Sequence, residues 1–100
     1  MNFEELEKAV IKWAEDRLIF EQSDALAQGE KLKEEYEELI AALSCPDEAN
    51  AIDAIGDMLV VLTQIAHFLG KDLFTCYAAA YLEIKDRKGK MVNGIFVKET

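Results

Sequence analysis

The 100-residue sequence contains little of what interrupts or cross-links a chain: one proline, five glycines and two cysteines. The scarcity of proline and glycine, and the lack of low-complexity segments or solenoid-period repeats, exclude a linker-rich or repetitive chain. Cys45 and Cys76 have no CxxC spacing and are too few for a disulfide framework, so we expect free thiols. Residues 1–100 are therefore expected to form a single globular domain.

Basic residues are also scarce, with eleven Lys or Arg against twenty Asp or Glu and a net charge of −9. This balance argues against a nucleic-acid partner, because sequence-independent binding requires many phosphates to be neutralised. An acidic surface favours solubility and divalent cations instead. Five of the basic residues fall in the last sixteen positions, namely Lys85, Arg87, Lys88, Lys90 and Lys98.

Long aliphatic runs are missing as well. The longest, residues 58–62, is too short to span a bilayer, and Gln64 and His67 interrupt its continuation. The N-terminal segment carries acids where a signal peptide requires a positive region. These features predict a cytoplasmic protein with no membrane partner.

Helical periodicity is the main feature that the sequence does contain. Apolar residues three and four apart predict an amphipathic helix over residues 3–20. Ser23 and Asp24 offer N-caps for a second helix that stops before Pro46. Gly70 and Asp72 mark the end of a third helix and the start of a fourth. The later helices are thus expected over residues 24–44, 47–69 and 73–87.

Only the segment MVNGIFV, residues 91–97, has strand character. Its Asn-Gly pair favours a tight turn, so a hairpin and a short extended arm both remain open. The expected fold is an all-α, four-helix bundle with a short C-terminal extended arm. The third helix is apolar nearly all round, which is typical of a bundle centre or a subunit interface.

Helix phase divides the acids of the stretch EEYEEL, residues 34–39. With 3.6 residues per turn, Glu34 and Glu37 point away from the apolar stripe of their helix, towards water. Glu35 and Glu38 lie along one flank of that stripe. The sequence therefore predicts one solvated pair and one inward-facing pair.

The third helix carries two further acids, Asp53 and Asp57, which are four residues apart and share a face. Like charges on a buried helix are costly unless a proton or a cation relieves them, and Mg²⁺ prefers carboxylate oxygen. If the second and third helices pack antiparallel across the turn at Pro46, these aspartates meet Glu35 and Glu38. Periodicity alone leaves a metal site and a salt-bridged structural cluster equally open.

The segments KLKEEYEELIAAL and DAIGDMLVVLTQIAHFLG and the tail EIKDRKGKMVNGIFVKE resemble the MazG-like members of the all-α nucleoside triphosphate pyrophosphohydrolase superfamily. The likeness is to the small, single-domain, phage-type forms. That family binds Mg²⁺ through ExxE on one helix and ExxD on the next. Glu35 and Glu38 match the first motif and Asp57 ends the second, whereas Ala54 stands where the second motif has Glu. Asp53, one residue earlier, is expected to substitute.

The resemblance implies hydrolysis of an NTP or dNTP to the monophosphate and pyrophosphate by a homodimer or tetramer. It implies Mg²⁺ as the cofactor, with Mn²⁺ as a substitute, bound by Glu35, Glu38, Asp53 and Asp57. Either Glu35 or Glu38 would activate water. The substrate-binding candidates are Gln28, Lys31, Trp13, Lys85, Arg87, Lys88 and Asn93.

Other interpretations remain open. The chain is alternatively a non-catalytic helical module for dimerisation or binding, or a base-specific dUTP, dCTP or phosphoribosyl-ATP hydrolase. Cations at the end of the fourth helix are also favoured by the helix dipole alone. Trp13 on an apolar stripe is more typical of a core residue than of a base-stacking residue, and His67 is expected to be structural.

Overall fold

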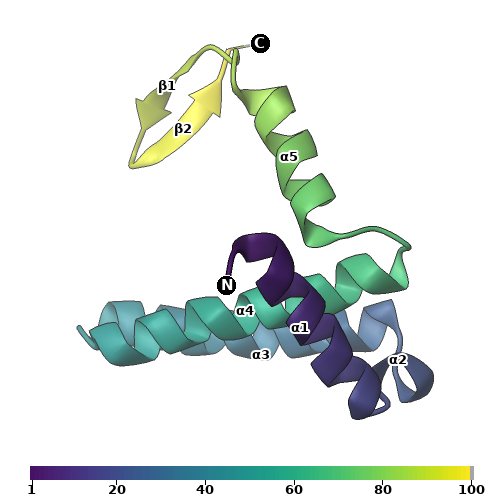
Figure 1. Cartoon of the computed structure of the whole chain (residues 1–100). Coiled ribbons are helices and arrows are strands. Elements are labelled where there is room, and N and C mark those ends of the chain that lie inside the picture. Colours follow the sequence, from purple (N-terminus) through teal and green to yellow (C-terminus); the bar gives the residue numbers. More distant parts are fainter. Residues whose placement is uncertain (100) are drawn as a thin grey trace.

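The computed structural model describes residues 1–99, which are mostly helical, as predicted (Figure 1). The fold has five helices followed by a two-stranded antiparallel hairpin. In chain order the elements are α1 (Phe3–Asp16), α2 (Ile19–Gln22), α3 (Ala25–Ser44), α4 (Glu48–Phe68), α5 (Leu73–Ile84), β1 (Gly89–Val92) and β2 (Ile95–Lys98).

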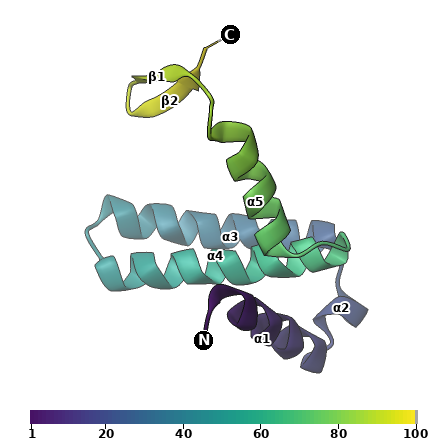
Figure 2. The same cartoon turned by 45° about the horizontal axis from the view of Figure 1, so that its top comes forward.

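The helices α3 and α4 form an antiparallel pair, and α1 packs on the other side of α4 (Figure 2). The Asp24 side chain caps α3 by accepting a hydrogen bond from the Ala27 N–H at 2.7 Å, and Asp47 caps α4 through the Asn50 N–H at 3.1 Å. The helix α3 ends just before Pro46, as the sequence predicts. The tight turn at this proline produces the expected antiparallel packing.

The core of the described chain is built from small side chains. The buried apolar residues are Ala14, Ala42, Ala54, Val61 and Ala66, and no large side chain among the described residues is fully buried. Small residues allow the helix backbones to approach closely, but they bury little apolar area. Much of the large apolar surface of the chain therefore remains exposed.

The helix expected over residues 3–20 is interrupted. Leu18 has a left-handed backbone with φ of 62°, which ends the first helix and starts the short α2. The break turns the Phe20 ring towards the end of α4, where its centroid lies 4.2 Å from that of His67 and 5.2 Å from that of Phe68. His67 thus has the packing role expected from the sequence.

The C-terminal end of α4 forms the predicted glycine cap. Gly70 has φ of 73°, and the Lys71 N–H donates to the Ala66 carbonyl at 2.9 Å. Asp72 then caps α5 by accepting from the Thr75 N–H at 2.6 Å. Both boundary predictions are confirmed.

The expected four-helix bundle does not close within one chain. The turn at Gly70 directs α5 away from the layer of α1, α3 and α4, and the hairpin lies at its far end (Figure 1). No residue of α5 is buried. We call α5 and the hairpin, residues 73–99, the arm.

The hairpin settles the alternatives left open for residues 91–97. Asn93 and Gly94 have φ of 50° and 82°, the left-handed pair that a two-residue turn requires, and Val92 pairs with Ile95. All eight strand residues are exposed. The hairpin is therefore formed by local turn chemistry and not by packing on the helices.

By length and composition α4 is apolar enough to cross a membrane, with a mean hydropathy of 1.4 over its most apolar window. Core helices of soluble proteins have the same property. In this fold α4 is the central helix, since it packs between α3 and α1 (Figure 2).

Candidate metal centre

Three carboxylates from two helices meet beside the α3–α4 contact. Glu35 and Glu38 of α3 and Asp57 of α4 each offer an oxygen atom, and these atoms all lie within 4.8 Å of one another. Helix spacing places the two glutamates on one face of α3, and the antiparallel packing brings Asp57 opposite to them. We call these three residues the carboxylate centre.

Glu35 is the buried member of the centre, with 6% of its surface exposed. Its Oε1 atom lies 3.4 Å from the Lys31 ammonium, whereas its Oε2 atom is buried without a hydrogen-bond partner in the described chain. An unpaired buried carboxylate oxygen is costly, so it requires a donor or a cation. Its neighbours Glu38 and Asp57 are themselves acids.

Electrostatics in the centre oppose full ionisation. The pKa of Glu38 is raised because a proton on Glu38 can be shared with Glu35 in a hydrogen bond, and because the charge of Glu35 repels ionised Glu38. The pKa of Asp57 is raised by burial and then by repulsion from Asp53 and Glu35. Lys31 lowers both pKa values but does not cancel these effects. The centre therefore lacks positive charge, which protons or a metal cation can supply.

Asp53 lies outside the group of three. It lines a hollow of about 370 Å³ between α3 and α4, together with Glu38, Asp47 and Asn50. Ala54, with 3% of its surface exposed, lies between the helices. The structure thus brings Glu35, Glu38 and Asp57 together and leaves Asp53 as a neighbouring charge.

The outward-facing acids lie where helix phase predicts. Glu37 is exposed, and the Glu34 side chain keeps 68% of its surface accessible while its Oε2 atom pairs with Lys31 at 3.6 Å. Glu37 therefore provides a chemically matched comparison for Glu38, one residue away on the same helix.

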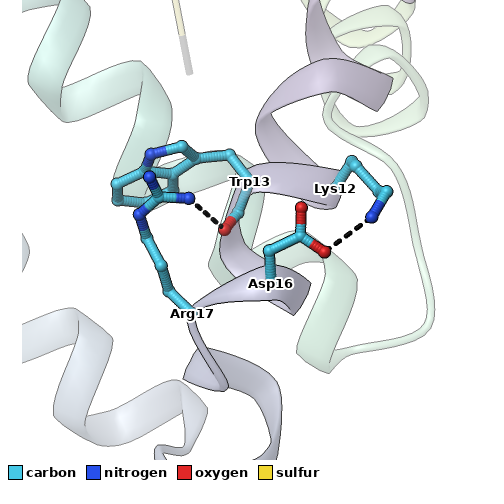
Figure 3. A network of polar contacts seen from close by, with 4 residues as sticks. All are labelled: Lys12, Trp13, Asp16 and Arg17. Atoms are coloured by element: carbon cyan, nitrogen blue, oxygen red, sulfur yellow. Dashed lines mark hydrogen bonds and ion pairs between the residues drawn. The ribbon is translucent and has the colours of Figure 1, made fainter.

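Trp13 lines a second hollow with Asp57, Val10 and Val60. It is 43% exposed and not a buried core residue. The Arg17 guanidinium lies 4.5 Å from the centroid of the indole ring and donates to the Trp13 carbonyl at 3.2 Å (Figure 3). The indole of Trp13 thus shares a hollow with Asp57 of the carboxylate centre, and Arg17 lies against the indole ring.

The other substrate-binding candidates are divided between α3, which carries Gln28, and the end of the chain from α5 to the hairpin. Gln28 donates to the Ser23 hydroxyl at 3.1 Å, and Arg87 pairs with Glu83 at 3.1 Å. The arm carries Lys85, Lys88 and Asn93 away from the α3–α4 pair (Figure 2). Any role for the arm residues Lys85, Arg87, Lys88 and Asn93 in a site at α3 and α4 requires the arm of another chain.

Glu7 is a functional candidate that the sequence reasoning missed. It is buried, and its Oε1 atom accepts a hydrogen bond from the backbone N–H of Leu73, the first residue of α5. The sequence signal is its position four residues after Phe3 and three before Val10, on the apolar face of α1. An acid on that face indicates a buried partner.

Compared with protein-family models, curated proteins and solved structures, the chain matches none of them. Membership of a family is therefore not shown.

Proposed function

We propose that the protein is a Mg²⁺-dependent hydrolase that cleaves nucleoside triphosphates, NTP or dNTP, to the monophosphate and pyrophosphate. The observation that supports this function best is the Glu35 Oε2 atom, a buried oxygen without a partner that lies among acids from two helices. We infer the type of reaction from the resemblance of the two acidic helices to those of MazG-like enzymes.

The donor set fits Mg²⁺, which prefers carboxylate oxygens and retains open positions for water and substrate phosphate. Glu35, Glu38 and Asp57 would hold the ion, with Asp53 as an additional nearby acid. When bound, Mg²⁺ neutralises phosphate charge and acidifies water. Mn²⁺, with similar preferences, is the natural substitute.

We assign Glu38 as the residue that accepts a proton from the attacking water. It is the exposed member of the centre, so one oxygen of its carboxylate is open to the attacking water while the other faces the ion. The water oxygen forms a bond to the α-phosphorus, the bond from that phosphorus to the bridging oxygen breaks, and pyrophosphate leaves. Glu35, buried and paired with Lys31, has the fixed position of a ligand.

Two side chains beside the centre have chemistry suited to the rest of a nucleotide. Lys31 contributes positive charge for phosphate oxygens. Trp13 offers an exposed aromatic surface, in a hollow that also contains Asp57, on which a base can stack. We further propose that the protein acts as a homodimer in which helices of two chains complete the bundle.

The test is a panel of canonical NTPs and dNTPs, including dUTP and dCTP, together with phosphoribosyl-ATP, incubated with Mg²⁺ and assayed for pyrophosphate and orthophosphate. We expect pyrophosphate release, loss of turnover in Glu38→Gln and retention of turnover in Glu37→Gln. Orthophosphate alone, or no turnover of any nucleotide, contradicts the proposal and favours a non-catalytic helical module.

A further inference from the structure

The surface of the chain is too large for a compact monomer. It exposes 7740 Å², whereas a monomer of this size exposes about 5,700 Å². The radius of gyration is 15.8 Å, compared with about 13 Å for a compact 100-residue domain. The excess of about 2,000 Å² per chain exceeds the ~800 Å² that each partner buries in a standard interface.

One part of this excess is an aromatic stripe on α5. Phe74, Tyr77 and Tyr81 are spaced three and four residues apart and therefore share a helix face. Their exposed fractions are 60%, 70% and 60%. An exposed apolar stripe of this kind marks a surface to which another surface binds.

A second part is a groove of about 290 Å³ between α1 and α4. Its lining is almost entirely apolar and includes Phe3, Leu6, Val10, Leu59 and Val60. Leu73 at the base of α5 also lines the groove, but the rest of α5 projects away from it (Figure 1). Each chain therefore carries an uncovered aromatic helix and an uncovered apolar groove.

The charges of the two parts are complementary. Residues 73–100 contain five Lys or Arg and three Asp or Glu, a net charge of +2. Residues 1–72 contain six Lys or Arg and seventeen Asp or Glu, a net charge of −11. The arm is therefore attracted electrostatically to the helical body of another copy. Salt screens this attraction and shortens the distance over which it acts.

We infer that two copies exchange arms: the aromatic stripe of α5 from each copy packs in the α1–α4 groove of the other. In a two-fold interface each chain gives its arm and receives one, so both uncovered apolar surfaces are buried at once. The basic end of each arm then lies on the acidic body of the partner. Val10 and Val60 line both the groove and the hollow that holds Asp57, so a docked arm lies next to the carboxylate centre.

Pairing of α5 with α5 is the main competing arrangement, and the structure disfavours it. It leaves the α1–α4 groove uncovered and brings two basic arms together. Arm exchange accounts for the exposed helix, the exposed groove and the opposite charges with a single contact.

The first test measures mass by light scattering during size-exclusion chromatography. We expect the wild-type chain to be a dimer, and Tyr77→Ala in the stripe and Leu6→Ala in the groove each to raise the dimer dissociation constant by about 30-fold or more. Leu26→Ala is the matched control, because Leu26 is 78% exposed on α3 and outside both surfaces. Circular dichroism confirms that each variant keeps its helices.

Mixing the two defective chains separates arm exchange from α5–α5 pairing. The Leu6→Ala chain has an intact arm, and the Tyr77→Ala chain has an intact groove. In the mixture this arm fits this groove, so one of the two contacts of the dimer is restored. We therefore expect heterodimers under conditions in which each variant alone is monomeric. A monomeric wild-type chain, a dimer unaffected by either variant, or no gain on mixing overturns the inference. The measured quantity is mass, so failure of this inference is distinguishable from lack of nucleotide hydrolysis.

Discussion

Lys31 and Glu35 lie one turn apart on α3, with the Lys31 Nζ atom 3.4 Å from Glu35 Oε1. The pair satisfies one oxygen of a buried carboxylate and leaves the other, Oε2, without a partner among acids. A cluster built only for stability would pair each buried oxygen with a donor. This half-satisfied carboxylate is the feature that favours a metal centre over a salt-bridged structural cluster.

Mg²⁺ is expected to stabilise the folded protein. A ligand at about 100 times its dissociation constant adds ~2.7 kcal/mol when it binds only the folded state. We predict that the melting temperature rises with Mg²⁺ relative to EDTA, that Glu35→Gln loses this rise and that the outward-facing Glu37→Gln keeps it. Differential scanning fluorimetry measures the effect, and an undiminished rise in Glu35→Gln excludes Glu35 as a ligand.

The metal-free protein is expected to lose part of its stability as pH rises. The pKa of Asp57 is raised, so the folded chain holds more protons than the unfolded chain above the ordinary carboxyl pKa of about 4. By linkage, this contribution is fully present below that value and is lost as pH rises through the raised pKa.

Asp57→Asn removes this titration and provides the comparison. We predict that, in EDTA, the difference in melting temperature, variant minus wild type, becomes more positive as the pH rises from about 4 to about 7. The pKa of Asp72 is lowered by its hydrogen bonds to Thr75, which acts in the opposite direction. Comparing both proteins at each pH cancels that contribution, and a pH-independent difference contradicts the prediction.

Asp53 and Asp57 are expected to differ in metal binding. Asp57 belongs to the group of oxygens within 4.8 Å, whereas Asp53 acts on it only as a repelling neighbour. We predict that Asp53→Asn changes the Mg²⁺ dissociation constant by at most about tenfold, equivalent to ~1.4 kcal/mol, whereas Asp57→Asn abolishes binding. Titration calorimetry measures both, and equal losses would make Asp53 a direct ligand.

The predictable parts of the fold are those set by local chemistry. Asp24, Gly70 and Asp72 mark helix boundaries because their side chains or backbone freedom satisfy helix ends. Asn93 and Gly94 specify the hairpin turn in the same way. Periodicity also separates Glu35 from Glu34, because helix phase is a property of the sequence alone.

The unpredicted parts depend on contacts between distant segments. Leu18 has a left-handed backbone although it is not a glycine, so the sequence does not mark this break between helices. Its conformation brings Phe20 against α4. The start of α5 is joined to α1 by a hydrogen bond from the Leu73 N–H to Glu7, which is far from it in the sequence. The closeness of Asp57 to Glu35 is predicted only on the condition that their helices pack antiparallel, and the packing of α3 on α4 meets that condition.

Two glycines of the helical layer are expected to respond oppositely to alanine. Gly70 has φ of 73°, which an alanine adopts only with strain, so Gly70→Ala is expected to destabilise the fold by about 1–2 kcal/mol. Gly29 lies inside α3 with open space around it, so Gly29→Ala is expected to stabilise by about 0.5–1 kcal/mol. Chemical denaturation measures both, and a shift of the same sign in both variants refutes the assigned backbone roles.

The hydrogen bond from the Leu73 N–H to the buried Glu7 carboxylate is expected to hold the base of the arm. A hydrogen bond to a charged group contributes about 1.5–3 kcal/mol, so Glu7→Ala should speed hydrogen exchange of the Leu73 amide by about 10- to 100-fold. Glu7→Gln keeps a side-chain carbonyl acceptor and should preserve most of the protection. NMR exchange of this amide makes the comparison, and equal rates in the two variants would show that Glu7 fills space at the base of α5 without anchoring it.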